Sequence, residues 1–219
     1  MFTGIVETVA EIQAVADKGG DKALAIRVDG LDLSGVKLGD SIAVNGVCLT
    51  VTHLDNSGFH ADISRETLSL SSLASVKAGA PVNIERALLA SGRFDGHIVS
   101  GHIDGTGTIT ERYDDARSIR LNVSVPEPLR RYTAHKGSIC IDGVSLTINA
   151  LSSEGVELNI IPHSAAQTII AGYRPGTVVN LEVDIIARYL ERLLTGSGAK
   201  PDGISEAFLA EHGFLRGRG

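Results

Sequence analysis

The sequence predicts an all-β fold in which one small β-rich module occurs twice, end to end. The first observation is an internal repeat. Residues 39–52 read GDSIAVNGVCLTVT and residues 136–149 read KGSICIDGVSLTIN, at an offset of 97 positions. The second is an Asn-Gly or Asp-Gly pair between two alternating apolar runs in each copy, which is a strong β-hairpin signal. The third is the abundance of glycine, at 25 residues, which indicates frequent turns.

The repeat extends beyond the hairpin without a gap. The same offset aligns residues 2–7 with 99–104, 63–67 with 160–164, and 79–85 with 176–182. Alternating apolar residues at 24–28 and 119–123 predict a further strand at equivalent places in the two copies. Short strands at regular spacing, separated by turns, favour a small barrel or sandwich for each copy.

Helical patterns are few. Residues 64–73 and 162–171 each have room for one short helix, and the clearest helix covers residues 184–194. Its apolar residues recur at helical spacing and share one face: Ile186, Tyr189, Leu190, Leu193 and Leu194. Because this helix belongs to neither copy, its apolar face needs a partner, either its own barrel or another chain.

These patterns predict four segments. We expect a first barrel over residues 1–97, a second over 98–184, an oligomerisation helix over 185–195, and a flexible Gly-rich tail over 196–219 with a loose helical turn near 204–212.

Composition excludes several classes of function. The formal net charge of −6 argues against a nucleic-acid partner. No apolar run approaches the length of a membrane span, and the N-terminus lacks the pattern of a signal peptide. Cys48 and Cys140 form neither a disulfide framework nor a CxxC metal motif, so we expect a cytoplasmic protein.

Four motifs carry a family resemblance. MFTGIVE at residues 1–7, NGVCLTVT at 45–52, SGHIDGTG at 100–107 and IDGVSLT at 141–147 closely resemble riboflavin synthases of the trimeric, two-barrel type. The resemblance runs from residue 1 to about 194. Each motif alone is weak, and the ordered set together with the duplication makes the resemblance specific.

The resemblance implies a fold and an activity. Each copy is expected to form a six-stranded Greek-key β-barrel that binds one 6,7-dimethyl-8-ribityllumazine. The family moves a four-carbon unit between two such molecules, giving riboflavin and 5-amino-6-ribitylaminouracil without a metal or other cofactor. The resemblance also implies a homotrimer with an active site between barrels of two chains. A possible partner on the same basis is lumazine synthase.

The resemblance also implies the residues that contact ligand. In the first barrel these are Gly4, Ile5, Val6, Cys48, Leu49, Thr50, Asp62, Ile63, Ser64, Arg65, Glu66 and Thr67. In the second they are Gly101, His102, Ile103, Lys136, Ser145, Leu146, Thr147, Asn159, Ile160, Ile161, Pro162, His163 and Ser164.

Catalysis must remove a proton from the methyl group on C7 of one lumazine and activate the other. His102 is the candidate acid or base, since a histidine titrates near neutral pH. Ser145 and Asp184 are expected to form a polar pair, and Phe2 to pack against a bound ring. Cys48 is either a nucleophile or a lining residue.

Other polar residues receive a structural interpretation. Five histidines are assigned no catalytic role: His53, His60, His97, His135 and His212. Asn83, Asn180, Glu85 and Glu182 recur in both copies, which favours structural hydrogen bonds. Val47 stands where some relatives have a second cysteine, so a cysteine pair is excluded, and Ser164 replaces a threonine that is common among relatives.

Three other functions are less well supported by the sequence. A binding protein on the same scaffold would hold lumazine or flavin without turnover, and the retained His102, Cys48, Ser145 and Asp184 favour an enzyme. A flavin reductase would need a nicotinamide module, and no GxGxxG follows a strand. A serine hydrolase is disfavoured because no GxSxG is present.

Overall fold

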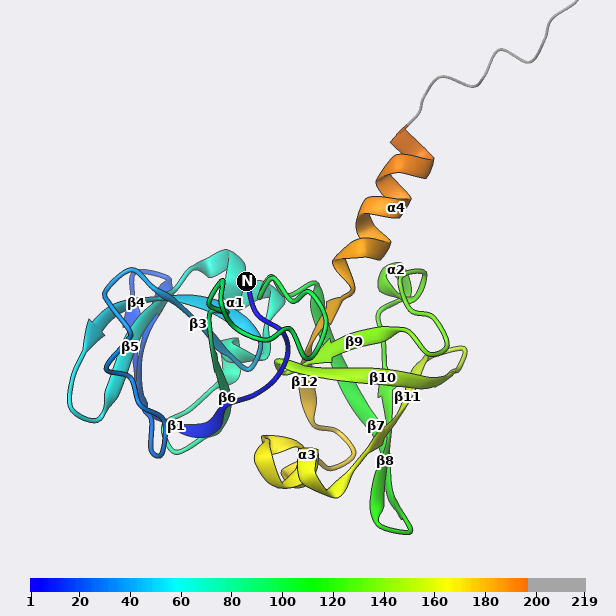
Figure 1. The fold of residues 1–219 in the computed structure, drawn as a ribbon, viewed down its shortest axis with the longest axis horizontal. Helices are drawn as coiled ribbons and strands as arrows, with labels where there is room; N and C mark the ends of the chain where they lie inside the picture. The colour runs from blue at the N-terminus through cyan, green and yellow to red at the C-terminus, as the bar shows by residue number, and fades with distance from the viewer. Residues whose placement is uncertain (197–219) are drawn as a thin grey trace, which may run out of the picture. The chain divides into compact units, whose positions relative to one another are not determined.

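The structure, a computed structural model, describes residues 1–196. These residues form two units, residues 1–185 and the residues from 186 onward. The larger unit, residues 1–185, contains two closed six-stranded antiparallel barrels (Figure 1). The predicted tail beyond residue 196, with its turn near 204–212, lies outside the described residues. Within residues 1–196, none of the helices has the length and apolar character needed to cross a bilayer.

The first barrel is closed by pairing of its first and last strands, in the order β1-β2-β5-β4-β3-β6. Its strands are β1 (Thr8–Lys18), β2 (Asp21–Arg27), β3 (Ser41–Val44), β4 (Val47–Leu54), β5 (Gly58–Ile63) and β6 (Pro81–Arg86). The second barrel has the same cyclic order, β7-β8-β11-β10-β9-β12. Its strands are β7 (Gly105–Asp115), β8 (Ser118–Ser124), β9 (Ser138–Ile141), β10 (Val144–Leu151), β11 (Gly155–Ile160) and β12 (Val178–Val183). The predicted duplicated Greek-key barrel is confirmed.

Alternation of side chains places a separate apolar core inside each barrel. Ile26, Phe59 and Ile84 lie in the first core, and Leu121, Leu158 and Leu181 in the second. The hairpin turns are as predicted, because Asn45 and Asp142, each followed by glycine, have the positive φ of a type I′ turn.

Each predicted short helix is divided in two. The first consists of α1 (Arg65–Leu70) and the 3-10 turn η1 (Ser72–Ser75), and the second of α3 (Pro162–Gln167) and η2 (Ile169–Gly172). A four-residue helix, α2 (Glu127–Arg130), was not predicted. The C-terminal helix α4 (Ile185–Gly196), whose residues from 186 form the second unit, matches the predicted helix to within two residues at each end.

The two barrels are joined by reciprocal hydrogen bonds. The Asn83 side-chain amide donates to the carbonyl of Asp142 at 2.8 Å, and that of Asn180 donates to the carbonyl of Asn45, also at 2.8 Å. The two hairpin turns cross so closely that a Cβ on Gly46 would stand 2.7 Å from the amide nitrogen of Gly143. The recurring asparagines therefore hold the two barrels together.

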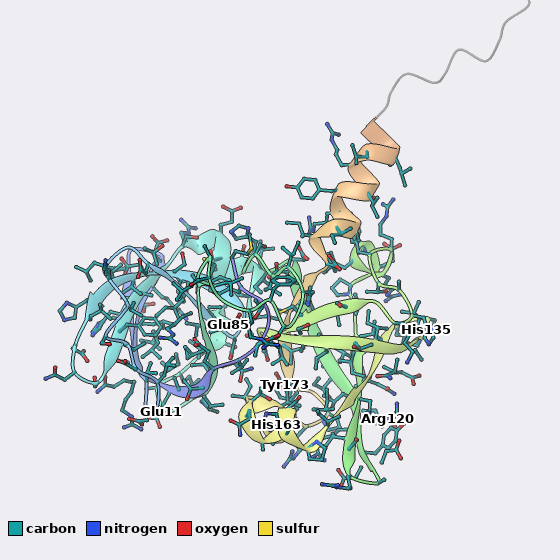
Figure 2. All side chains as sticks on the ribbon, in the orientation of Figure 1. Glu11, Glu85, Arg120, His135, His163 and Tyr173 are labelled. Carbon is teal, nitrogen blue, oxygen red and sulfur yellow. The ribbon has the colours of Figure 1, made fainter. Side chains whose placement is uncertain are left out.

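The two recurring glutamates anchor the segments that precede each barrel. Glu85, labelled in Figure 2, accepts hydrogen bonds from the amides of Thr3 and Gly4 at 2.7 and 3.0 Å. Glu182 accepts equivalent bonds from the amides of Ser100 and Gly101 at 2.6 and 3.0 Å. We call residues 1–7 and 98–104 the leading segments. Their fixed backbones position the site described next.

Candidate active site

Cys48 and Ser145 occupy equivalent positions at the starts of β4 and β10, and both side chains are half-buried on the outside of their barrels. The amide of Cys48 donates to the carbonyl of Gly101 at 2.9 Å, and the amide of Ser145 donates to that of Gly4 at 2.7 Å. Each strand therefore pairs with the leading segment of the other copy.

This crossing corrects the predicted grouping of the contact residues. The sequence prediction places Gly4, Ile5 and Val6 with the first barrel and Gly101, His102 and Ile103 with the second. In the structure Val6 packs against the second core and Ile103 against the first. Each leading segment therefore contacts both barrels, because its amides also bind the glutamate of its own copy, Glu85 or Glu182.

Glycine is required where these backbones meet. Gly101 has a φ of +82°, and a Cβ there would stand 2.5 Å from Cβ of Cys48. Gly4 has a φ of +76°, and a Cβ there would stand 2.7 Å from Cβ of Ser145. Both positions need a left-handed backbone and no side chain.

The first barrel carries a cavity of about 240 Å³ beside Cys48. Its lining combines the start of β4, the first turns of α1 and the second leading segment: Val47, Cys48, Glu66, Thr67, Leu70, Gly101, His102 and Ile103. Ser64 caps α1 by accepting a hydrogen bond from the Thr67 amide at 3.2 Å, which fixes that turn. The structure thus brings six of the predicted contact residues to one pocket.

The second barrel has a polar pair at the equivalent place. The hydroxyl of Ser145 lies 2.7 Å from Nδ1 of His97, which is buried, and Nε2 of the same ring has no hydrogen-bond partner among the described residues. Burial lowers the pKa of His97, and the negative charge of Asp184 opposes that effect. The imidazole is therefore neutral at neutral pH, as a proton acceptor must be.

Sequence reasoning missed His97. Asp184 is the partner predicted for Ser145, and that Ser145–Asp184 pair stays a prediction. His97 has no counterpart in the repeat, because it lies in the short connection between the copies. The one available signal was its place immediately before the second leading segment. This placement needs glycine at position 96, since a Cβ on Gly96 would collide with the carbonyl oxygen of Thr3.

Phe2 is fully buried between the barrels, in a cluster with Ala43, Val99 and Cys140. Its ring lies under Gly101, where an added Cβ would approach Cε2 to 3.0 Å. Phe2 therefore supports the wall of the first pocket. A direct contact between Phe2 and a bound ring stays a prediction.

The other predicted contact residues follow the strand alternation. Thr50 and Thr147 are exposed on the outer faces of β4 and β10, and Lys136 is exposed with a φ of +64°. Several side chains point into the cores, so only their backbones can meet a ligand: Leu49, Ile63, Leu146 and Ile160. The rest lie at the ends of β5 and β11 or in the following helical turns: Asp62, Arg65, Asn159, Ile161, Pro162, His163 and Ser164.

A larger cavity, of about 600 Å³, lies between the first leading segment and residues 85–95. It shares Ile5 with the predicted contact residues. Two of its charged lining residues, Arg86 and Glu7, form an ion pair at 2.6 Å. No predicted catalytic residue lines it.

Comparison with known proteins agrees with this geometry. The family model described as the lumazine binding domain matches residues 3–87 and again 100–184. A riboflavin synthase from Photobacterium phosphoreum is 45% identical over 217 residues, covering 98% of this chain and all of that protein. One from Bacillus subtilis is 41% identical over 216 residues, with coverage of 98% and 100%. This chain belongs to the riboflavin synthase family.

Solved structures agree on the fold of this family. The crystal structure of LumP complexed with 6,7-dimethyl-8-(1'-D-ribityl) lumazine is similar with a TM-score of 0.76, at 22% identity, covering 84% of this chain and 99% of that one. LumP complexed with riboflavin gives a TM-score of 0.78, also at 22% identity and with the same coverage. At this identity the similarity concerns the fold alone. The two family-model matches, in contrast, each contain one of the paired positions Cys48 and Ser145.

Proposed function

We propose that this protein converts two molecules of 6,7-dimethyl-8-ribityllumazine into riboflavin and 5-amino-6-ribitylaminouracil. The observation that carries the proposal is a pair of equivalent outward-facing positions with different chemistry. Cys48 and His102 lie at the position in the first barrel, and Ser145 and His97 lie at the equivalent position in the second. Two similar sites suit two copies of one substrate, and the chemical difference suits a reaction in which one copy donates and the other accepts.

The reaction needs no external reagent. A four-carbon unit leaves one lumazine and is incorporated into the other, so all atoms of the two substrates are divided between the two products. Neither an oxidant nor a reductant enters the balance. This agrees with the expectation that the protein uses no metal, nucleotide or flavin as cofactor.

The neutral imidazole of His97 supports a role in proton transfer at the second barrel. With the Ser145 hydroxyl at 2.7 Å, the ring can accept a proton from that hydroxyl or from a water bound to it. Asp184 favours the resulting imidazolium through its negative charge. At the first barrel, His102 is exposed beside the pocket and is the group available to a ring seated against Cys48.

Holding the two substrate molecules in position contributes further to the rate of the reaction. The first pocket, at about 240 Å³, is smaller than the roughly 300–1,000 Å³ typical of sites that enclose a ligand. A lumazine held there keeps one face open for the second lumazine. Two reacting groups that are held together in the right orientation react as if one were present at an effective molarity of about 10⁵ M or more.

A homotrimer is part of the proposal. The apolar face of α4 has the spacing of a helix that packs against other helices, and the family resemblance implies that the first barrel of one chain meets the second barrel of another. A cytoplasmic location is proposed because the two cysteines form no disulfide framework. An association with lumazine synthase is proposed on the family resemblance.

The proposal is tested by identifying both products. Ligand-free protein is mixed with the lumazine alone, without added metal or nucleotide, and the mixture is separated by chromatography. Riboflavin and the pyrimidine in equal amounts support the proposal. Recovery of unchanged lumazine in a tight complex would favour a carrier.

A further inference from the structure

Three metal-ligating side chains meet at the tip of the β4–β5 hairpin. One ligand atom each of His53, Asp55 and His60 lies within 4.8 Å of the other two. Nε2 of His60 is 3.1 Å from Oδ2 of Asp55, and the rings of His53 and His60 are 5.1 Å apart, edge to face. None of the three belongs to the site described above.

A β-bulge brings the two histidines together. β4 and β5 pair Val51 with Ala61, and after a register shift they pair His53 with His60. Without the extra residue, alternation would place His53 opposite Phe59, which is buried in the core. Bulges commonly re-aim a side chain in this way, and here both imidazoles emerge on the outer face of the barrel.

The second barrel offers an internal comparison, because its hairpin has the same bulge. There the register shifts between Ile148 and Ala150, and Ala150 pairs with Glu157. At the 97-residue offset, His53 corresponds to Ala150, His60 to Glu157 and Asp55 to Ser152. The hairpin therefore folds without any of the three ligands, and the architecture does not explain their presence.

Asp55 has one more oxygen than its turn requires. Its Oδ1 accepts hydrogen bonds from the Ser57 amide at 2.7 Å and the Gly58 amide at 3.0 Å. In the second barrel the hydroxyl of Ser152 alone accepts equivalent bonds, from the Glu154 and Gly155 amides. Oδ2 of Asp55 is surplus to the turn and faces His60, already oriented as a ligand.

The geometry fits a tetrahedral ion. Two ligands at about 2.0 Å from a zinc ion are separated by about 3.3 Å, close to the 3.1 Å between His60 and Asp55. The exposed His53 side chain completes the set by rotation. Two imidazoles and one carboxylate favour a first-row divalent ion over calcium or magnesium, and the partial exposure of the cluster leaves a position for water.

We propose that His53, Asp55 and His60 form a binding site for a divalent transition-metal ion of the zinc class, which clips the tip of the β4–β5 hairpin. The site is separate from the catalytic pocket. Cys48 lies five residues back along β4, about 16 Å away at the rise of a strand. The ion is structural, and turnover does not depend on it.

The test uses the full chain without an affinity tag, stripped with a chelator and titrated with Co²⁺ and then with Zn²⁺. We expect one Co²⁺ per chain with visible d–d bands, displacement of that Co²⁺ by Zn²⁺, and a thermal midpoint that rises with added Zn²⁺. A thiolate charge-transfer band in the near ultraviolet would mean that a cysteine holds the ion and would overturn the proposal.

The test variants replace ligands of the first barrel by the residues found at the equivalent positions of the second barrel. His53→Ala and Asp55→Ser install the residues of the equivalent hairpin, so folding is preserved, and each is expected to weaken Co²⁺ binding at least about tenfold. His135→Ala removes an exposed histidine of the second barrel, labelled in Figure 2, and leaves binding unchanged. Absence of saturable binding in the wild type, or equal binding by His53→Ala, would overturn the proposal.

Discussion

The hydroxyl of Ser145 and Nδ1 of His97 lie 2.7 Å apart across the junction of the two barrels. Ser145 is the second residue of β10 in the second barrel, and His97 ends the connection from the first. If this pair transfers a proton as a unit, each residue depends on the other.

A double-mutant cycle tests that dependence. We expect Ser145→Ala and His97→Gln each to lower kcat by about 10²-fold, and the double variant to be no slower than the worse single one, because paired catalytic residues are not additive. Steady-state formation of riboflavin is the measurement, and His135→Gln is the matched control. Effects that multiply in the double variant would show that the two residues act independently.

A second prediction concerns the contact between Gly101 and Cys48. Gly101→Ala introduces both a strained backbone and a collision with Cys48, whereas Gly30→Ala introduces strain at a φ of +80° with open space around it. We expect Gly30→Ala to lower the free energy of unfolding by about 1 kcal/mol and Gly101→Ala by about 2 kcal/mol more. Urea denaturation measures both. Equal losses would mean that Gly101 does not contact β4 closely.

The buried Asp142 predicts a dependence of stability on pH. Burial raises its pKa to about 7, against the hydrogen bonds from the Tyr173 hydroxyl and the Asn180 amide, at 2.6 and 2.7 Å. The folded state therefore retains a proton that the unfolded chain releases at lower pH. The contribution of this group to stability is greatest below about pH 4 and is lost as the pH rises through 7.

Asp142→Asn removes that dependence, and Asn45 shows that the first barrel uses asparagine at the equivalent position. We expect the variant to gain up to about 4 kcal/mol over the wild type at pH 8 and little at pH 4. Urea denaturation at the two pH values measures the difference. A gain of the same size at both values would contradict a raised pKa.

The apolar face of α4 predicts the oligomeric state. Leu190→Glu places a charge on that face, and we expect it to convert a trimer into monomers and to reduce the specific activity. Arg192→Glu, on the opposite face, changes charge without touching the apolar residues and should leave the trimer intact. Sedimentation velocity distinguishes the species. A wild-type protein that sediments as a monomer would remove the basis for a shared active site.

Much of the fold was accessible from the sequence because it depends on local chemistry. Asn45-Gly46 and Asp142-Gly143 determine their turns, and the offset of 97 residues shows that two copies share one topology. The pairing of each leading segment with a strand of the other barrel was not accessible from the sequence. A repeat shows that Gly4 and Gly101 are equivalent, but not which barrel each backbone pairs with.

The same limit applies to the site. Cys48, Glu66, Thr67 and His102 were expected together and line one pocket. The contact between His97 and Ser145 joins residues 48 positions apart and depends on how the two barrels dock. No periodic pattern reports such a contact, which explains why His97 received a structural interpretation.

The central claim is that two chemically different pockets act on two copies of one substrate. The most direct measurement follows lumazine consumed and riboflavin formed by the purified, ligand-free protein under conditions of multiple turnover. The account predicts one riboflavin for every two lumazines, with turnover reduced in Ser145→Ala. Tight binding of lumazine with no riboflavin formed would contradict it and would make the duplicated scaffold a carrier.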